Sequence, residues 1–112
     1  MIIEITTYKA AQGISHEALV EASKAFDQNY CARCKGLISR DFLKTEAGYM
    51  DIFKWQSLAD VEHVQATFMQ DKDAVAFAQF LNPETLTMHN YEVLDVFEPS
   101  LYSTSINNRE IG

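Results

Sequence analysis

The sequence lacks the features that mark several common classes of protein. Its 112 residues contain no run of about 18 apolar residues, so we expect no membrane span. Nine lysines and arginines are spread without a cluster and the net charge is −7, which argues against nucleic acid or an anionic membrane as a partner. Two cysteines are too few for a secreted disulfide framework. The N-terminal residues lack a basic, apolar signal segment, and we expect a cytoplasmic protein.

Motifs for cofactors and metals are also scarce. There is no glycine-rich phosphate loop, nucleophile elbow or paired-carboxylate signature. Cys31 and Cys34 form a CxxC motif, but it closes a predicted helix, where the helix dipole disfavours a thiolate. No second CxxC or HxxxH supplies the remaining ligands of a zinc site. We therefore predict neither a cofactor nor a metal.

What the sequence does have is a clear order of hydrophobic periods. Runs of period two predict four strands, at 2–8, 36–44, 49–55 and about 85–98. Helical periods lie between the first two strands and before the last, at about 15–34 and 57–81. We expect Ser15 to cap the first of them, and a kink or restart at 71–73 to begin a short third helix. The order β-α-β-β-α-β predicts an α+β, ferredoxin-like fold, with a four-stranded antiparallel sheet and helices on one face. We expect one domain over 1–98 and a C-terminal tail over 99–112, either loose or packed on a partner subunit.

The predicted strands are apolar on both faces, although the helices cover only one face. Two sets of side chains compete for the covered face: Leu37, Phe53, Trp55, Val93 and Phe97 against Ile3, Ile38, Phe42, Met50 and Ile52. Half of them must lie on the other face, where they would form a larger apolar patch than a soluble monomer normally exposes. Packing two such faces across a two-fold axis removes the patch, so the sequence predicts a homodimer. The space left between sheet and helices would hold a small apolar or aromatic ligand.

One stretch of the sequence, residues 35–70, resembles the antibiotic-biosynthesis-monooxygenase family of dimeric α+β barrels. It contains a glycine opening a strand, a glycine-bearing hairpin, a strand ending in tryptophan, a polar helix cap and a helical histidine. In this sequence these are Gly36, Gly48, Trp55, Ser57 and His63. The resemblance implies a dimeric barrel fold and a ligand pocket with Trp55 in its wall. The same fold also serves noncatalytic binding proteins.

Several polar side chains stand among the apolar residues of the predicted strands. His89 and Tyr91 share one face of the last strand, and we predict that they are catalytic. The predicted substrate-binding residues are Trp55, Phe53, Arg40 and Asp51. Convergence of these groups on one cavity would suit proton transfer to or from a phenol-like substrate. The alternative is a set of satisfied hydrogen bonds and ion pairs without a chemical role.

Two functions remain open at this point. The resemblance implies cofactor-free oxidation of an aromatic or polyketide-like substrate, with His89 as base and Tyr91 or Arg40 as hydrogen-bond donor. The alternative is a noncatalytic homodimeric module that binds a ligand or has a structural role. An enzyme should have an apolar pocket with a titratable group inside it. A structural dimer should have that space filled by large side chains, namely Phe53, Trp55, Phe68, Phe77 and Met88.

Overall fold

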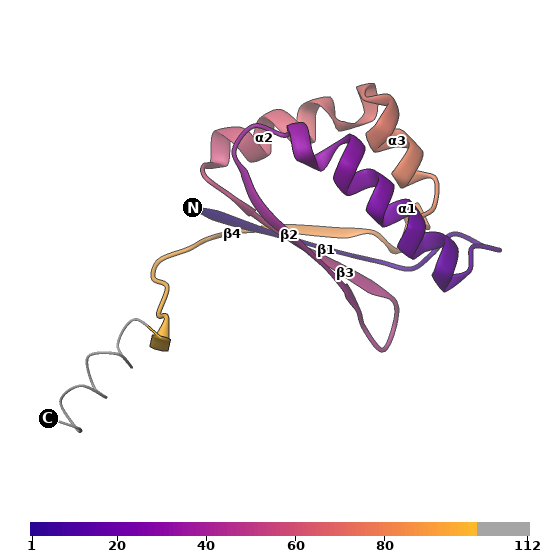
Figure 1. Cartoon of the computed structure of the whole chain (residues 1–112), viewed down its shortest axis with the longest axis horizontal. Helices are drawn as coiled ribbons and strands as arrows, with labels where there is room; N and C mark the ends of the chain where they lie inside the picture. Colours follow the sequence, from indigo (N-terminus) through magenta and orange to yellow (C-terminus); the bar gives the residue numbers. More distant parts are fainter. Residues whose placement is uncertain (101–112) are drawn as a thin grey trace, which may run out of the picture.

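A computed structural model describes residues 1–100 of the chain. Its strands are β1 (Ile2–Tyr8), β2 (Leu37–Lys44), β3 (Tyr49–Trp55) and β4 (Thr87–Glu92). Its α-helices are α1 (His16–Asn29), α2 (Leu58–Thr67) and α3 (Lys72–Ala78), and its 3-10 turns are η1 (Cys31–Arg33), η2 (Phe68–Gln70) and η3 (Pro83–Thr85). The strands form one antiparallel sheet in the order β2-β3-β1-β4, and all three α-helices lie over one face of it (Figure 1). The predicted α+β, ferredoxin-like fold is confirmed.

The helices begin where polar side chains can accept hydrogen bonds from free backbone N–H groups. Ser15 accepts from the N–H of Ala18 at the start of α1, and Ser57 accepts from the N–H of Asp60 at the start of α2. The predicted restart at 71–73 is confirmed, because Asp71 caps α3 as a new helix within the stretch 57–81. None of the helices within residues 1–100 is long and apolar enough to cross a bilayer.

A β-bulge in β2 changes which side chains of this strand face the helices. The pairing with β3 shifts between Leu37 and Ser39, which leaves Ile38 as an extra residue on the open side. Arg40 and Phe42 then pair with Phe53 and Asp51 and lie on the helix-covered face. The sequence analysis placed Phe42 with the residues opposite Phe53, which is wrong, because strict alternation from Leu37 does not allow for the extra residue.

β1 places two polar side chains on its helix-covered face and two isoleucines on the other. Glu4 and Thr6 are buried under the helices, together with the apolar Ile2 and Tyr8 at the ends of the strand. Ile3 and Ile5 alternate with them and therefore point to the face of the sheet that no helix covers. This arrangement departs from the usual pattern of a two-layer monomer, in which the polar side chains of a strand face solvent.

β4 is shorter than predicted. The expected strand over about 85–98 ends at Glu92, although the N–H of Val93 still donates a hydrogen bond to the carbonyl of Met1. The following segment leads away from the body of the molecule, with Leu94 and Phe97 exposed (Figure 1). Of the predicted tail over 99–112, residues 101–112 lie outside the part that the structure describes.

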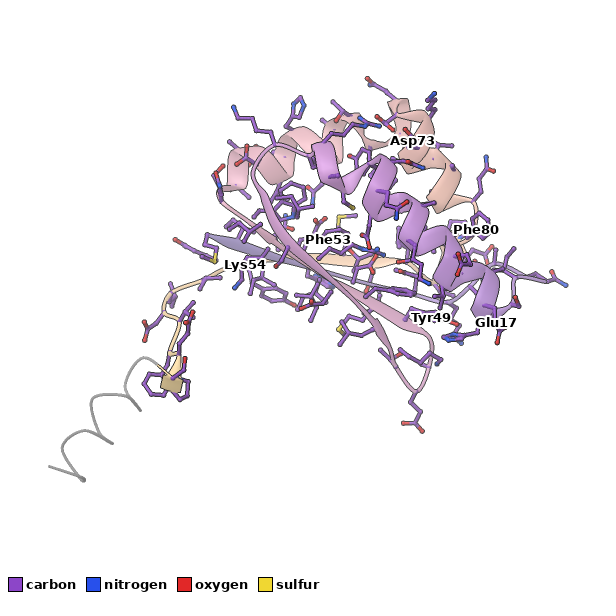
Figure 2. The ribbon with its side chains drawn as sticks, viewed as in Figure 1. Glu17, Tyr49, Phe53, Lys54, Asp73 and Phe80 are labelled. Carbon is purple, nitrogen blue, oxygen red and sulfur yellow. The ribbon has the colours of Figure 1, made fainter. Side chains whose placement is uncertain are left out.

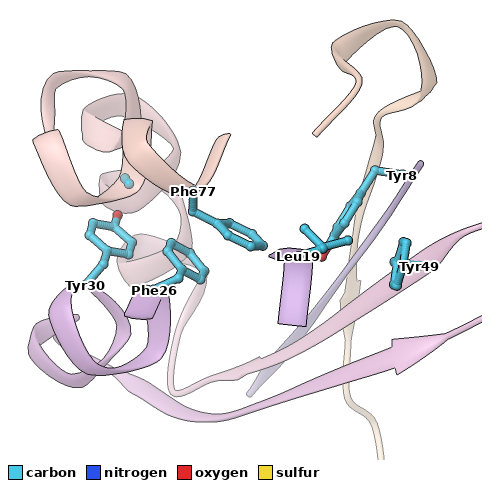
Figure 3. Close-up of a cluster of buried hydrophobic side chains, with 7 residues drawn as sticks. Tyr8, Leu19, Phe26, Tyr30, Tyr49 and Phe77 are labelled. Atoms are coloured by element: carbon cyan, nitrogen blue, oxygen red, sulfur yellow. The ribbon is translucent and has the colours of Figure 1, made fainter. Parts of the chain in front are cut away.

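Aromatic rings dominate the core between the sheet and the helices. Phe26 of α1 and Phe77 of α3 stack with ring centroids 4.4 Å apart, and Tyr30 stacks on the other side of Phe26 at 5.3 Å. Figure 3 shows these three rings at one end of the cluster, with Tyr8 and Tyr49 at the other end. The fully buried Leu19 lies between these two groups of rings.

Candidate functional site

A cavity of about 670 Å³ lies between the sheet and the helices. Its wall is almost entirely apolar, and Phe53, labelled in Figure 2, lies in this layer between β3 and the helices. The five large side chains expected to fill this space in a purely structural dimer are instead part of its wall: Phe53, Trp55, Phe68, Phe77 and Met88. Five polar side chains are also part of its wall, namely Glu4, Thr6, Asp51, Gln65 and Gln79. A concave, mostly apolar space with a few polar groups is the usual form of a small-molecule site.

Asp51 is the more strongly bonded of the two buried carboxyl groups. Its Oδ1 accepts a hydrogen bond from Nη2 of Arg40 at 2.8 Å, and its Oδ2 accepts one from the hydroxyl of Tyr8 at 3.1 Å. Burial raises the pKa of Asp51 to about 6, although Arg40 acts in the opposite direction. Asp51 is therefore mostly ionised at neutral pH, and it is a stronger base than an ordinary aspartate.

Arg40 holds the charge of Asp51 inside the protein. Its side chain is only 3 % exposed, and its Nη1 also donates to Asp27 and to the hydroxyl of Ser23, at 2.9 and 2.7 Å. Its guanidinium lies within 6 Å of the centroids of four phenylalanine rings: Phe26, Phe42, Phe53 and Phe77. The buried Nε of Arg40 has no hydrogen-bond partner within residues 1–100. This cation is thus fixed by two carboxylates and surrounded by aromatic rings.

Glu4 is the second buried carboxyl group of the cavity, and its environment differs from that of Asp51. It lies on β1, two residues before Thr6, which pairs with Asp51. Its Oε1 accepts a hydrogen bond from the indole Nε1 of Trp55 at 3.1 Å, and its Oε2 accepts one from the amide of Gln65 at 3.2 Å. The residue is 5 % exposed, and no cationic side chain forms an ion pair with it in the described part of the chain. Burial raises the pKa of Glu4 above its usual value, against the effect of the two hydrogen bonds.

Both cysteines line the cavity as free thiols. Burial raises the pKa of Cys31 to about 12, and burial also raises the pKa of Cys34. Both side chains are therefore protonated at neutral pH and are poor nucleophiles. Within residues 1–100 no three His, Cys, Asp or Glu side chains gather closely enough to hold a metal ion.

The structure brings together four of the six residues singled out in the sequence. Trp55, Phe53 and Asp51 line the cavity, and Arg40 binds Asp51. His89 and Tyr91 are elsewhere: they alternate with Met88 and Asn90 on β4 and lie on the open face of the sheet. His89 pairs with Ile5, an outward residue of β1, so its parity carries it away from the cavity.

Of the five polar residues of the cavity only Asp51 was predicted, and Glu4 and Gln65 are the most informative of the four that were missed. Glu4 stands between isoleucines in a strand, and Gln65 stands on α2. The available signal for Glu4 was a charged side chain on the same face of the predicted strand as Ile2 and Thr6. No sequence signal marks Gln65, because a glutamine on a helix is ordinarily solvated.

The same arrangement of helices and sheet occurs in solved structures. One is a "putative antibiotic biosynthesis monooxygenase" from Nitrosomonas europaea, with a TM-score of 0.64 and 15% identity over 85% of this chain and 100% of that one. Another is a "putative monooxygenase" from Shewanella loihica, with a TM-score of 0.60 and 19% identity over 85% of this chain and 95% of that one. The chain has their fold. A "dimeric protein of unknown function and ferredoxin-like fold" from Bacteroides fragilis also matches, with a TM-score of 0.55 and 12% identity over 82% of this chain and 95% of that one.

No protein-family model and no curated protein matches the sequence. The solved structures confirm the predicted resemblance to antibiotic-biosynthesis monooxygenases at the level of the fold. At identities of 12–19%, this likeness carries neither a substrate nor a reaction.

Proposed function

We propose that the protein binds a small, largely apolar molecule in the cavity and removes a proton from it with Asp51. The observation that carries this proposal is a buried carboxylate of raised pKa in the wall of a 670 Å³ apolar cavity. A general base works best when its pKa lies near the working pH, and Asp51, with a pKa of about 6, meets this condition. Its bond to Arg40 keeps it ionised at neutral pH and fixes its position.

The fold of the monooxygenase-like structures supports an oxidation as the outcome of this proton transfer. In our proposal the substrate has an acidic CH₂ group, and one of its protons goes to Asp51. The carbanion gives its electrons to O₂ and a C–O bond forms. The peroxide anion takes the proton back from Asp51, and the resulting hydroperoxide loses water to leave a carbonyl. One oxygen atom enters the product and the other becomes water, so no external reductant is needed. The protein contributes the base and a cavity that excludes water.

A noncatalytic binding module is the second candidate, and one observation favours it. Both oxygens of Asp51 already accept hydrogen bonds, from Arg40 and Tyr8. In this role the Asp51–Arg40 pair would only fix the wall of the cavity.

We also propose that the protein is a homodimer formed through the open face of the sheet. The support is the outward apolar side chains of the two central strands, including Ile3, Ile5, Met50 and Ile52, on a face that no helix covers. A second copy with the same face would cover this patch across a two-fold axis. His89 and Tyr91 lie on this face and would then be interface residues rather than cavity residues.

The binding proposal is tested by calorimetry with 1-naphthol. Ala78 lines the cavity, and Ala78→Leu reduces its space, so we expect this change to weaken binding at least about tenfold. Ala76→Leu is the matched control, because Ala76 is exposed on the same helix, and it should bind as the unaltered protein does. Absence of 1-naphthol binding, or equal weakening by both changes, would contradict the proposal.

The catalytic part is tested by oxygen uptake with those ketones that bind and that carry a CH₂ group next to the carbonyl. Asp51→Asn should lower uptake by about 10² to 10⁴-fold, since that is the usual contribution of a general base, while ligand affinity changes little. Glu62→Gln is the control, because Glu62 is exposed on α2, away from the open face of the sheet. Unchanged uptake in Asp51→Asn, or no uptake by any bound compound, would favour the binding module.

A further inference from the structure

The two carboxyl groups of the cavity have opposite kinds of partners. Asp51 contacts the guanidinium of Arg40, whereas Glu4 accepts only from the neutral donors of Trp55 and Gln65. A carboxylate without a cation in apolar surroundings is costly, so such a group tends to keep its proton. A pair of carboxyl groups in unlike environments divides into an acid and a base.

The side chains that face Glu4 from the surrounding elements do not change this difference between Asp51, which has a cationic partner, and Glu4, which has only neutral donors. β3 contributes Asp51 and the indole of Trp55, and α2 contributes the neutral amide of Gln65. On β4 the residues of the same parity are Met88 and Asn90, which do not titrate, and the exposed Glu92, which pairs with Ile2 and is a carboxyl group like Glu4. Cys31, Cys34 and Tyr30 line the cavity from the end of α1 and η1, and burial raises the pKa of each. None of these groups places a positive charge beside Glu4.

The register of the sheet sets the spacing of the two carboxyl groups. Thr6 pairs with Asp51 and Glu4 pairs with Phe53, so Glu4 and Asp51 are diagonal neighbours on one face of β1 and β3. Diagonal neighbours on antiparallel strands lie about 7–8 Å apart. Side chains at that spacing can reach two adjacent polar positions of one small molecule held between them.

We infer that Glu4 is the hydrogen-bond donor of the cavity and that the ligand is a ketone, with its carbonyl oxygen at Glu4 and its α-carbon at Asp51. This inference rests on the proposed function and names its substrate class. The step it implies is enolisation. The α C–H bond breaks and its proton goes to Asp51, a C=C bond forms, and the carbonyl oxygen takes the proton of Glu4. No electrons leave the substrate, and oxidation by O₂ would follow from the enol or its anion.

The first measurement uses Trp55, the only tryptophan of the sequence. Its indole donates to Glu4, so its fluorescence should change as Glu4 titrates. We expect a transition above the ordinary glutamate pKa of about 4.3 that Asp51→Asn retains and Glu4→Gln abolishes. A transition at the ordinary value, or one that persists in Glu4→Gln, would overturn the assignment of Glu4 as the acid.

The second measurement compares 2-tetralone with tetralin, the hydrocarbon of the same shape, by calorimetry on either side of that transition. Below it, the protein should prefer the ketone by about tenfold, the usual effect of one hydrogen bond. Above it, the preference should disappear, because an ionised Glu4 cannot donate. Glu4→Gln should keep the preference at both pH values, since an amide donates regardless of pH, and Glu4→Met should show none at either.

The third measurement follows deuterium exchange at the α-carbon of 2-tetralone in D₂O by NMR. Both Asp51→Asn and Glu4→Met should slow the catalysed exchange at least about tenfold. Glu62→Gln, a change at an exposed position of α2, is the control and should have no effect. Equal ketone preference in the unaltered protein and in Glu4→Met overturns the inference. If 1-naphthol still binds, the proposed binding function survives that result, and if neither it nor 2-tetralone binds, both proposals fail.

Discussion

Glu4 is the residue whose sequence neighbourhood gives least warning of its surroundings. It stands between two isoleucines that face outward, while its own carboxyl group faces a cavity with apolar walls. Burial raises its pKa above that of an unfolded chain, so folding favours the protonated form. The stability that Glu4 contributes is therefore complete below the unfolded pKa and is lost as pH rises through the folded one.

The sign of this linkage predicts that Glu4→Gln stabilises the protein at pH 8 and leaves it nearly unchanged at pH 4. Glutamine keeps the hydrogen-bonding shape but cannot ionise, so it avoids the cost of a buried charge, roughly 1 kcal/mol or more. In a domain of nearly this size, 1 kcal/mol raises Tm by about 4–8 °C. Thermal unfolding of both proteins at the two pH values measures the effect, with the exposed change Glu62→Gln as control. Equal Tm values at pH 8 would contradict the prediction.

Site residues on β3 could be found from the sequence, whereas the direction of the side chains on the edge strand β4 could not. Trp55, Phe53 and Asp51 alternate without interruption on an inner strand, so their shared face follows from their spacing. His89 was assigned to the cavity because the last strand is apolar at both parities, which fits either face. The face to which a side chain of β4 points depends on the register with β1. His89 points to the open face because it pairs with Ile5, and the sequence does not specify this pairing.

At the scale of elements, α2 matters most, because it carries Gln65 over the cavity to Glu4. Only one of its residues, Val61, is buried, so its start is held chiefly by Ser57. The Ser57 hydroxyl donates to the carboxylate of Asp60 at 2.8 Å and accepts from its backbone N–H at 3.2 Å. Gly36 fits closely against the same turn with φ +82°, and a side chain there would collide with Asp60.

We expect Ser57→Ala to lower the free energy of unfolding by about 1 kcal/mol, the usual cost of losing an N-cap. Because the start of α2 would be less firmly held, ligand affinity should fall as well. Urea unfolding measures the first effect and calorimetry with 1-naphthol the second. Ser39→Ala, at an exposed position of β2, should change stability by less than about 0.5 kcal/mol. A loss no larger than that of Ser39→Ala would show that the cap does not hold α2.

The starts of the helices could be predicted because capping chemistry is local. Ser15, Ser57 and Asp71 each stand where a polar side chain meets the beginning of a helical period. The end of β4 could not be predicted in this way. Residues 93–97 continue the apolar composition of the strand, and nothing local distinguishes a paired apolar residue from one that leaves the sheet.

At the scale of the whole molecule, the sheet separates two apolar environments. One is enclosed by helices and contains the cavity, and the other is the open face. The central strands contribute Ile5 and Ile52 as an adjacent pair on the open face. A monomer would leave this pair in contact with water, which is the physical reason for our expectation of a dimer.

We predict that the unaltered protein sediments as a dimer of 12.7 kDa chains and that Ile52→Asp sediments as a monomer. A carboxylate at the centre of the proposed interface would meet its own copy across the two-fold axis and lose its hydration. Ala66→Asp, at an exposed position of α2, is the control and should remain dimeric. Circular dichroism would confirm that both variants are folded. A monomeric unaltered protein, or a dimeric Ile52→Asp variant, would contradict the dimer proposal.

The extra residue in β2 has a consequence for how this edge strand tolerates a change in length. Ile38 bulges out of the ladder, so deleting it would leave Leu37, Ser39 and Arg40 opposite the same partners on β3, with Arg40 still beside Asp51. If instead the present residues paired in strict alternation from Leu37, Arg40 would turn to the open face and Asp51 would lose its cation. A related chain with one residue fewer at this point can therefore keep the ion pair, and a gap in an alignment there does not by itself indicate different chemistry.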